Sequence, residues 1–478
     1  MRAGDNDTIY GIAGNDGVVS SMNYLGFADT DSMTETVLSS GSYSFLKDNV
    51  HEILPVPEAT QRMMFQPPEY WALNIEGPID FDRLQWGCTE LVHRHEILRT
   101  VFVSFKNRSL HVVLGQIATE IQRLPGLRAN LDGVVDQHRR EDPISVPTID
   151  HPVAQFTHIQ GEHDKLILVV RLSHAQFDGY SLHTLWHDLE CLYEDQGTRL
   201  SPPARLSSHI QQWIKAQHQE EAFKYWKEVL GGSTVTRINN SIFDDNSHAT
   251  HSREPHLITA SHRAHLGTAI IPHSITQASL VKAAWAFLLS RLKDTQSVVF
   301  AQTSNGRNHA SPESNAHQLV NMSLNHIPVR VTLNPSWTAL DLMQSIQTQY
   351  TTSLPYELLD FSAIVKQSTS WPHGTTHQNN LVHQNIDPDE PFPFGPTATA
   401  QVTCSYEWPQ PPVEILIESK PLLDGDGYGN VGLQLTMDIR GGVLNQVNAD
   451  LVVQKLARLV EAFSNTPDES LETFGDVI

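Results

Sequence analysis

The chain has 478 residues, enough for about two to four folding units of ordinary size. Its 54 acidic residues against 32 basic ones give a formal net charge of −22, and no run of Lys or Arg interrupts this balance, which excludes a nucleic-acid partner. A hydrophobic share of 40% supplies sizeable cores, which excludes a disordered or coiled-coil chain. The 25 histidines are an unusual surplus whose role has to be found.

Residues 1–50 are rich in Gly, Asp, Asn and Ser and have no sustained hydrophobic period, so we expect a leader, a linker or the remnant of an upstream module. Asn6-Asp7 recurs as Asn15-Asp16, a spacing similar to calcium-binding nonapeptide repeats, but two copies are too few to stack. The segment lacks the apolar core of a signal peptide, and no run in the chain approaches the ~18 apolar residues of a membrane span.

The three cysteines, Cys88, Cys191 and Cys404, lie far apart and form no C-x-x-C pair. This usage favours neither a disulfide framework nor a structural zinc site, and it fits a reducing compartment. We therefore expect a soluble, cytoplasmic protein with no membrane partner.

From Pro57 onward the pattern is typical of an α/β protein. Apolar residues at helical spacing predict a helix over 80–95, with Asp80 as its N-cap. The run LILVVRL is apolar on both faces, so it predicts a central strand. Strands in two consecutive hairpins are expected at 99–105, 109–114, 153–159 and 165–173.

A helix is expected to follow from Leu182 to a stop at Gly197, and helical patterning continues over 207–230. The polar stretch 233–260 is interpreted as a loop between lobes. We therefore place an N-terminal lobe at 51–232 and a C-terminal lobe at 233–478.

The second half repeats the α/β pattern. Ser274-Ile-Thr-Gln277 resembles a capping box before LVKAAWAFLLSRL, whose all-round hydrophobicity predicts a buried helix. Loops rich in Pro and Asp, at 386–398 and 420–430, are expected at the surface. The second of them lacks the Glu of a calcium loop, and no Gly-rich phosphate loop occurs in the chain. Strands are expected at 297–302, 325–333, 380–385, 412–418 and 431–439, and helices near 338–350 and 449–463.

The densest group of reactive side chains is the segment Arg171-Leu-Ser173-His174-Ala-Gln-Phe-Asp178-Gly179-Tyr-Ser181, at the end of the central strand. A loop after a strand presents an imidazole to a cleft, where a pKa near 6.5 allows proton exchange at neutral pH. The Asp178 carboxylate either contacts His174 or turns away to fix the loop through an Arg. Gly179 permits a positive φ, and Ser181 is placed to cap the next helix.

Four motifs in order resemble those of the condensation domains of nonribosomal peptide synthetases, relatives of chloramphenicol acetyltransferase. The segment above is similar to H-H-x-x-x-D-G. The other three matches are Leu54 to Gln61 for L-P-x-T-x-x-Q, Arg94 to Phe102 for R-H-x-x-L-R-T-x-F, and Asn305-Gly306-Arg307-Asn308 followed by Asn325 to Arg330 for the G-R-N and N-x-x-P-V-R pair. The resemblance covers about 50–470 of the chain.

The resemblance implies an α/β fold of two chloramphenicol-acetyltransferase-like lobes, arranged as a V-shaped pseudo-dimer with the active site between them. It implies that His174 is the catalytic imidazole, and that Asp178 is structural, faces away from it and pairs with Arg99. The loops at 386–398 and 420–430 are implied rim or lobe-bridging elements. Further site residues are expected at Ser173 and Gly179 as supports, and at Ser181, Asn305 and Asn325 as substrate contacts.

Ser173 stands where the family signature has its first His. Similar S-H-x-x-x-D-G-x-S versions occur in terminal condensation-like domains of fungal synthetases, which release the finished peptide by cyclisation. The resemblance therefore implies macrocyclisation of a peptidyl thioester, delivered on the phosphopantetheine arm of an upstream peptidyl carrier protein. We expect no cofactor or metal bound by the domain itself, and a monomer.

Other functions stay open. An ordinary chain-extending condensation domain would join two carrier-bound substrates. A stand-alone acyl-CoA acyltransferase shares H-x-x-x-D-G but usually carries D-F-G-W-G, where this chain has Asp438-Ile-Arg-Gly441. An epimerisation domain usually has Trp where Leu182 stands. A non-catalytic docking domain is disfavoured because His174, Asp178 and Arg99 are all present.

The remaining histidines give weaker signals. His183 and His187 share a helical face at a spacing that suits zinc, but the residues between them are Thr-Leu-Trp, without the Glu of H-E-x-x-H. The histidines from His248 to His273 lie in or just after the polar linker, where we interpret them as polar surface residues. His174 is therefore the one histidine to which we assign chemistry.

Overall fold

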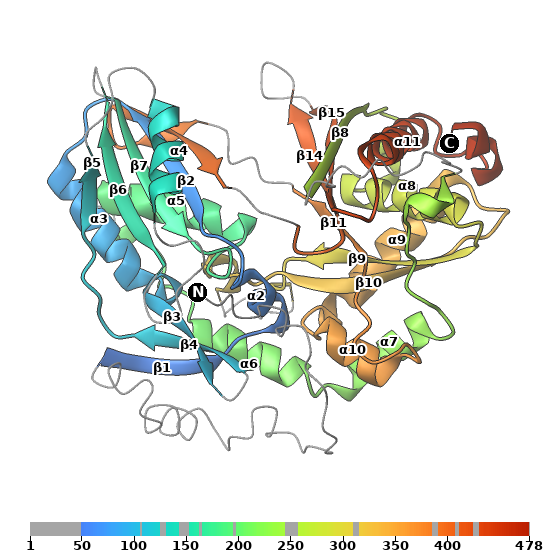
Figure 1. The fold of residues 1–478 in the computed structure, drawn as a ribbon, viewed down its shortest axis with the longest axis horizontal. Coiled ribbons are helices and arrows are strands. Elements are labelled where there is room, and N and C mark those ends of the chain that lie inside the picture. The colour runs from blue at the N-terminus through green and yellow to red at the C-terminus, as the bar shows by residue number, and fades with distance from the viewer. Residues whose placement is uncertain are drawn as a thin grey trace, which may run out of the picture.

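A computed structural model describes residues 49–105, 108–124, 131–142, 153–161, 165–194, 197–243, 257–308, 315–384, 391–406, 411–423 and 430–477. Within these residues, helices and strands build two lobes, each centred on a six-stranded sheet (Figure 1). The expectations for the leader at 1–48 lie outside the described residues, as do those for 244–256 and for the loop centres at 385–390 and 424–429.

The first lobe contains a mixed sheet with the strand order β12-β13-β2-β7-β6-β5 and a separate three-stranded sheet, β1-β4-β3. Strands β12 (Phe392–Phe394) and β13 (Ala398–Ser405) come from the second half of the chain. Strand β7 lies in the interior of the large sheet, so the predicted central strand is confirmed, as are the two hairpins β3-β4 and β6-β7. The elements of this part of the chain are β1 (Val50–Pro55), α2 (Glu58–Met63), β2 (Glu69–Glu76), α3 (Phe81–Arg94), β3 (Thr100–Phe105), β4 (Arg108–Leu114), β5 (Ile121–Leu124), α4 (Leu131–Glu141), β6 (Gln155–Gln160), β7 (Lys165–Leu172), α5 (Gly179–Tyr193) and α6 (Leu206–Ala216).

Both faces of this large sheet are covered by helices, as the two-sided apolar sequence of β7 requires. Leu91 of α3 and Leu185 of α5 pack with Leu168 of β7 on one face. Val134 of α4 packs with Ile167 of β7 on the other. Helix α3 begins after Asp80, whose side chain accepts from two backbone N–H groups of the first turn, as the sequence predicts.

The second lobe has the strand order β10-β9-β11-β14-β15-β8. The strands expected at 297–302, 325–333, 380–385, 412–418 and 431–439 and the two expected helices are confirmed with shifted ends. The elements of this part of the chain, apart from β12 and β13, are α7 (Glu220–Leu230), β8 (Leu257–His265), α8 (Gln277–Leu292), β9 (Ser297–Ser304), β10 (Asn325–Thr332), α9 (Ala339–Ser353), α10 (Phe361–Ser368), β11 (Asn379–His383), β14 (Ile415–Leu423), β15 (Asn430–Arg440) and α11 (Gln446–Asn465).

Helix α8 is buried continuously from Ser279 to Leu289, as its apolar sequence predicts, and packs with α11 and α9 on one face of the second sheet. Its N-cap is Thr276, which accepts from the N–H of Ser279. The cap expected at Ser274 is therefore wrong, because Ser274 forms the preceding turn with a φ of 54°.

The lobe boundary expected at 233 is wrong in both directions, because segments on each side of it pack in the other lobe. Strand β13 pairs with β2 along Thr399 to Ser405, so β12 and β13 cross from the second half into the sheet of the first lobe. The described end of the loop expected at 386–398 thus bridges the lobes. In the other direction, α7 packs Trp226 against Ile327 and Ile364 of the second lobe. The helical stretch expected at 207–230 is two helices, one for each lobe.

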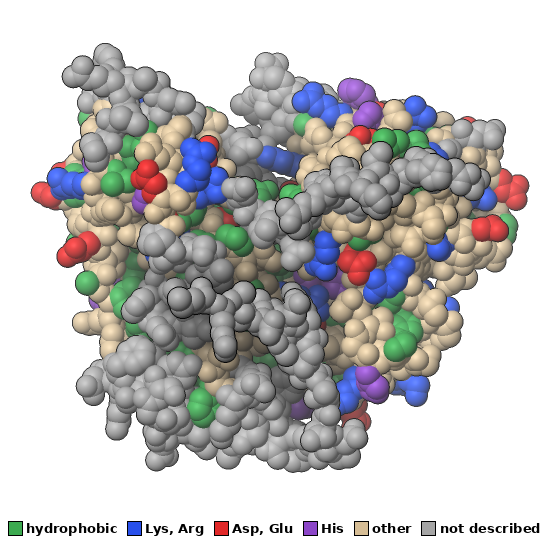
Figure 2. All heavy atoms as spheres, viewed as in Figure 1, with side chains coloured by type: hydrophobic (Ala, Val, Ile, Leu, Met, Phe, Trp, Pro, Cys, Tyr) green, Lys and Arg blue, Asp and Glu red, His purple; other side chains and the backbone are tan. Residues whose placement is uncertain are grey.

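Two further expectations fail at element ends. The helix after the reactive segment begins at Gly179 rather than near Leu182 and ends at Tyr193, before Gly197. Strand β8 begins inside the stretch expected to be a linker. Its sequence did not predict a strand because only Ile258, Ala260 and Ala264 are buried, and alanine is a weak strand signal. In space-filling view a notch separates the two lobes at the upper edge of the molecule (Figure 2).

Candidate active site

The loop between β7 and α5 is fixed by its own hydrogen bonds. The N–H of Gln176 donates to the Ser173 carbonyl at 2.8 Å, and the Ser173 N–H donates to Gln176 Oε1 at 3.0 Å. Gln176 Nε2 donates to the Ile97 carbonyl at 2.9 Å, which ties the loop to the segment after α3. Ser173 is fully buried, and its Oγ accepts from the N–H of Ala175 at 3.2 Å. Ser173 therefore supports the shape of the loop.

His174 is the one half-buried imidazole of this loop. Its Nδ1 lies 3.0 Å from the carbonyl oxygen of Phe177. Because a carbonyl only accepts, Nδ1 carries the hydrogen in the neutral ring and Nε2 carries the lone pair. The imidazole stacks on the Phe177 ring, with 4.9 Å between the ring centroids and 7° between the planes. The Trp71 ring packs edge-on against Phe177, with 5.6 Å between their centroids. Orientation and tautomer are thus fixed by the chain.

Asp178 forms an ion pair across the lobe junction. Arg307, which follows β9, donates from Nη1 to one carboxylate oxygen at 2.8 Å and from Nη2 to the other at 3.1 Å, and neither side chain is exposed. The pairing with Arg99 expected from the family resemblance is wrong. Arg99 instead donates to backbone carbonyls, at 2.8 Å to Leu114 and 2.9 Å to His93, because it packs between α3 and β4.

Asp178 is held as a carboxylate by its neighbours. Burial raises the pKa of Asp178, but the Arg307 guanidinium and the N–H groups of Ser323 and Ser181 outweigh that effect, and the pKa is lowered overall. The Ser323 N–H donates at 3.0 Å and the Ser181 N–H at 2.9 Å. Asp178 therefore points toward the second lobe, where Arg307 and the two backbone N–H groups bind its charge.

The start of α5 differs from expectation at two residues. Asp178 is the N-cap, so Ser181 is not. The Ser181 hydroxyl lies 2.7 Å from the Asn321 carbonyl and 2.8 Å from Asp178 Oδ1, and it accepts from the Asn321 N–H at 3.0 Å. Gly179 does not have a positive φ. A β-carbon at Gly179 would instead lie 3.3 Å from the side-chain oxygen Oε1 of Gln384, the residue after β11.

The two asparagines expected to contact substrate form structural hydrogen bonds. Asn305 Oδ1 accepts from the N–H of Arg307 at 2.9 Å and shapes the turn after β9. Asn325 Nδ2 donates to the carbonyls of Glu357 at 2.8 Å and Leu359 at 3.0 Å, so both of its hydrogens are committed. The structure therefore brings Asn305 to the ion pair through its neighbour Arg307 and places Asn325 in the wall of a nearby pocket.

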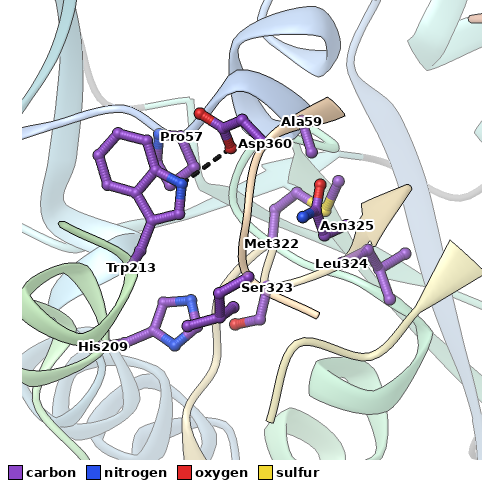
Figure 3. A pocket seen from close by; sticks show the side chains of 10 residues that line it. Pro57, Ala59, His209, Trp213, Met322, Ser323, Leu324, Asn325 and Asp360 are labelled. Atoms are coloured by element: carbon purple, nitrogen blue, oxygen red, sulfur yellow. Dashed lines mark hydrogen bonds between the residues drawn. The ribbon is translucent and has the colours of Figure 1, made fainter. Parts of the chain in front are cut away.

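That pocket lies where four segments of the two lobes meet (Figure 3). Trp213 of α6 faces Asp360, and its Nε1 donates to Asp360 Oδ1 at 2.9 Å. Ser323 also lines the pocket, and its N–H donates to Asp178, so the pocket adjoins the network behind the His174 loop. The lining residues are Pro57, Ala59, His209, Trp213, Met322, Ser323, Leu324, Asn325, Leu358 and Asp360.

Residues 68–390 match the family described as condensation domain. The chain belongs to the condensation-domain family. Similar relatives include nonribosomal peptide synthetase fmqA of Aspergillus fumigatus, 31% identical over 87% of this chain, and nonribosomal peptide synthetase 6 of Cochliobolus heterostrophus, 34% identical over 72%. The chain spans 10% of the first relative and 19% of the second. Condensation domains form amide bonds in nonribosomal peptide synthetases.

Solved structures share the fold. A chain described as holo T3CT superimposes with a TM-score of 0.80 at 24% identity, covering 93% of this chain and 99% of that one. The first condensation domain of the calcium-dependent antibiotic synthetase gives a TM-score of 0.67 at 13% identity, covering 89% and 99%. The expected α/β architecture of two lobes is confirmed.

The residues of this condensation domain that sequence reasoning missed are Arg307, Gln176 and Asn321. Arg307 was visible inside the motif Asn305-Gly306-Arg307-Asn308, but two motifs offered an arginine, and sequence alone gave no ground for choosing between them. Gln176 donates to the backbone carbonyl of Ile97, and Asn321 uses its own backbone N–H and carbonyl, so neither contact leaves a signal in side-chain patterns.

The described residues of the condensation domain offer no group of three or more His, Cys, Asp and Glu side chains arranged to hold a metal ion. None of the helices in the described part of the chain combines the length and the apolar character that a membrane span requires.

Proposed function

We propose that this condensation domain releases a carrier-bound peptide by closing it into a ring through an amide bond. The amine of the peptide attacks the carbonyl carbon of its own thioester, so that a C–N bond forms and the C–S bond to phosphopantetheine breaks. The amine proton passes to Nε2 of His174 and from there to the departing thiolate. The products are a cyclic amide and a free thiol, and the step needs no further reactant.

The orientation of His174 carries this proposal. Its Nδ1–H is committed to the Phe177 carbonyl, so Nε2 is the basic atom that the loop offers to an amine. A positioned general base of this kind is worth typically ~10²–10⁴-fold in rate. The stacked Phe177 ring and the hydrogen bonds of Gln176 hold the His174 imidazole in one orientation. A fixed base suits ring closure, because the rate of an intramolecular attack depends on how the reacting groups are oriented.

Ser173 supports the cyclising over the chain-extending role. Its side chain is fully buried and bonded to the backbone of Ala175, so the loop presents a single imidazole where the usual family signature has two histidines. The same serine marks the terminal, product-releasing type that the sequence resembles. Intramolecular attack also needs less from the enzyme than joining two carriers, because well-oriented groups reach effective molarities of ~10⁵–10⁸ M.

The partners follow from the reaction. The thioester arrives on the phosphopantetheine arm of an upstream peptidyl carrier protein, and the peptide folds between the lobes, beside the His174 loop. Four segments from both lobes converge on the pocket of Figure 3, which adjoins the Asp178 network behind the His174 loop, and this supports a binding region at the lobe junction.

The test is a cyclisation assay. A peptidyl thioester is loaded on a carrier protein, and the cyclic product is measured by mass spectrometry with wild type, His174→Ala and His187→Ala. We expect His174→Ala to lose ~10²–10⁴-fold in rate. His187 is a control on α5, the helix that follows the His174 loop; its side chain is 57% exposed, and its variant should behave as wild type.

Three results would count against ring closure. Equal rates for wild type and His174→Ala would remove the imidazole from the mechanism. A linear peptide formed only when a second, aminoacyl-loaded carrier is added would assign the domain to chain extension. Product formed from free acyl-CoA would assign it to the acyltransferases.

A further inference from the structure

The side chain of Gln384 reaches across the lobe junction to the end of the His174 loop. Gln384 directly follows β11 of the second lobe, and its N–H donates to the Ser419 carbonyl at 2.8 Å, which continues the pairing of β11 with β14. Its Oε1 would lie 3.3 Å from a β-carbon placed at Gly179, the first residue of α5. A residue with a fixed backbone in one lobe thus extends its amide to the active-site loop of the other.

Gln384 meets this loop on its accessible side. Within 173–180, His174, Gly179 and Tyr180 are partly exposed, and the other five residues are buried. Gln384 is partly exposed as well. The imidazole and the Gln384 amide therefore both border the accessible surface at this point of the lobe junction.

The loop is short enough for one substrate group to contact both side chains. His174 Nδ1 lies 3.0 Å from the carbonyl oxygen of Phe177. Gly179 is two residues farther along, so the Cα atoms of Phe177 and Gly179 are at most about 7.6 Å apart. A base and an oxyanion donor need a gap in which the reacting group lies about 3 Å from each of them. The spacing suits a single carbonyl group between the imidazole and the Gln384 amide.

The Gln384 amide has hydrogen-bonding capacity that the rest of the chain does not use. No hydrogen bond joins its side chain to any residue that the structure describes. By contrast, Gln176 Nε2 donates to the Ile97 carbonyl at 2.9 Å, and Asn325 Nδ2 donates to two carbonyls of the second lobe. A partly exposed amide exchanges water for a ligand without leaving a buried group unpaired. Gln384 thus offers two N–H donors to a bound molecule.

A neutral amide donor suits an oxygen on which negative charge develops. When an amine attacks a thioester, the carbonyl oxygen becomes an oxyanion, and side-chain amides of Asn and Gln are among the donors that stabilise such groups. Gln384 also follows the carboxyl end of β11, a strand that is parallel to both of its neighbours, β9 and β14. Open α/β sheets commonly place ligand contacts just beyond such strand ends.

We propose that Gln384 donates an Nε2–H to the carbonyl oxygen of the thioester and stabilises the oxyanion that forms there during amide formation. The proposal rests on the proposed reaction at His174. As the amine attacks, the C–N bond forms and an electron pair of the C=O bond moves to the oxygen, and its return breaks the C–S bond. Gln384 keeps its own protons throughout. One side chain from each lobe thereby acts on the same step.

The kinetic test compares two variants of similar size. Gln384→Met keeps the length of the side chain, and Gln384→Glu keeps acceptor oxygens but has no N–H donor. Both should lose about 10²–10³-fold in kcat with little change in KM, because the oxyanion exists only after the amine attacks. Rates are measured for ring closure and for capture of the same thioester by added glycinamide, since both reactions form this oxyanion.

The matched control is Gln122→Met, at an exposed amide on the edge strand β5, which should behave as wild type. A wild-type kcat in Gln384→Met overturns the proposal. A wild-type kcat in Gln384→Glu also overturns it, because a side chain without a donor would then be sufficient.

Gly179 provides an internal check of the contact. The φ of Gly179 is not positive, so its backbone accepts alanine, but the β-carbon of Gly179→Ala would crowd Gln384 Oε1 and displace the amide. We expect Gly179→Ala to lower kcat in the wild-type background and to have no further effect in Gln384→Ala. Equal losses in the two backgrounds would mean that residue 179 acts independently of Gln384 and would overturn the contact.

The hydrogen bond to the carbonyl is measured without turnover. A peptidyl N-acetylcysteamine thioester with ¹³C at the thioester carbonyl is bound to His174→Ala, and its C=O stretch is recorded by infrared difference spectroscopy. The band should lie at lower frequency than in His174→Ala combined with Gln384→Met, because a donated hydrogen bond weakens the C=O bond. The same frequency in both proteins overturns the donor. A wild type that captures glycinamide but closes no ring refutes the proposed function, while the capture rate and the band still decide for or against Gln384.

Discussion

Arg307 reaches across the lobe junction to Asp178 and donates to both of its carboxylate oxygens, at 2.8 and 3.1 Å. Asp178 caps the helix that follows the His174 loop, whereas Arg307 follows β9 of the other lobe. Both side chains are fully buried, so each charge depends on the other. The ion pair thereby links the position of the His174 loop to the orientation of the second lobe.

Removing one partner leaves an uncompensated buried charge. We expect Arg307→Gln to lower the free energy of unfolding by about 3–5 kcal/mol, measured by urea denaturation. Arg237→Gln is the control, because Arg237 pairs with Glu414 while its side chain is 46% exposed, and such pairs contribute at most about 1 kcal/mol. Equal losses in the two variants would contradict a special role for the buried pair.

The same pair predicts how stability depends on pH. The pKa of Asp178 is lowered in the folded chain, so its stabilisation is present above the unfolded value of about 3.9 and is lost as the pH falls through the folded value. The advantage of wild type over Arg307→Gln should therefore be constant near neutrality and shrink below pH about 4. A constant difference down to pH about 2 would show that the carboxylate charge is not involved.

The candidate site could be predicted from sequence where local chemistry decides and not where the lobes meet. The loop between a central strand and a helix followed from hydrophobic patterning and from the residues around His174. The partner of Asp178 did not, because Arg99 and Arg307 both lie in family-like motifs, and only the three-dimensional structure shows that Arg307 contacts Asp178 while Arg99 contacts backbone carbonyls. Asn305 and Asn325 carry polar groups that would suit a substrate, but backbone partners far along the chain use them.

The fold shows the same division. Strands with strong apolar runs, such as β7 and β9, were predicted within a few residues. Strands β2 and β13 were not predicted, and neither was their pairing, which connects residues more than 300 positions apart, such as Ala72 and Thr403. Nothing in the local pattern of β13 distinguishes a strand that stays in its own lobe from one that crosses.

The hydroxyl of Ser181 is predicted to act on stability rather than on substrate binding. It is fully buried between Asp178 and both backbone groups of Asn321. Ser181→Ala should lower the free energy of unfolding by about 1–3 kcal/mol, because these groups lose a partner, and leave KM for the thioester unchanged. Ser336→Ala, at an exposed hydroxyl bonded to Asn334, should cost much less. A raised KM at unchanged stability would return Ser181 to the substrate site.

Gly306 is predicted to be irreplaceable beside the ion pair. Its φ is 64°, and a β-carbon there would lie 1.9 Å from the carbonyl oxygen of Ser323. Gly374 has a φ of 79°, and a β-carbon placed there would have no atom within 4 Å. The variant Gly374→Ala therefore measures the cost of the backbone conformation alone. We expect Gly374→Ala to cost about 1 kcal/mol of stability and Gly306→Ala about 3 kcal/mol or more, measured by thermal unfolding. Similar losses would mean that Ser323 moves freely.

Lys282 is a buried amine with no carboxylate among the partners found in the described residues. It is 4% exposed, its Nζ donates to Gln302 Oε1 at 2.6 Å, and it lies 4.5 Å from the centre of the Tyr350 ring. Burial lowers the pKa of Lys282 to about 8. Between that value and about 10.4 the unfolded chain binds more protons than the folded one, so this group makes stability rise with pH in that window.

Lys282→Met removes the titrating group and keeps an unbranched side chain of similar length. We expect the free energy of unfolding of wild type, minus that of the variant, to rise by up to about 3 kcal/mol between pH about 8 and about 10.4, measured by urea denaturation. Taking the difference cancels the tyrosines and cysteines that titrate in the same range. A difference that falls or stays flat over this window would place the ammonium in a more polar environment than its burial indicates, because only a desolvated amine favours the unfolded chain when it is charged.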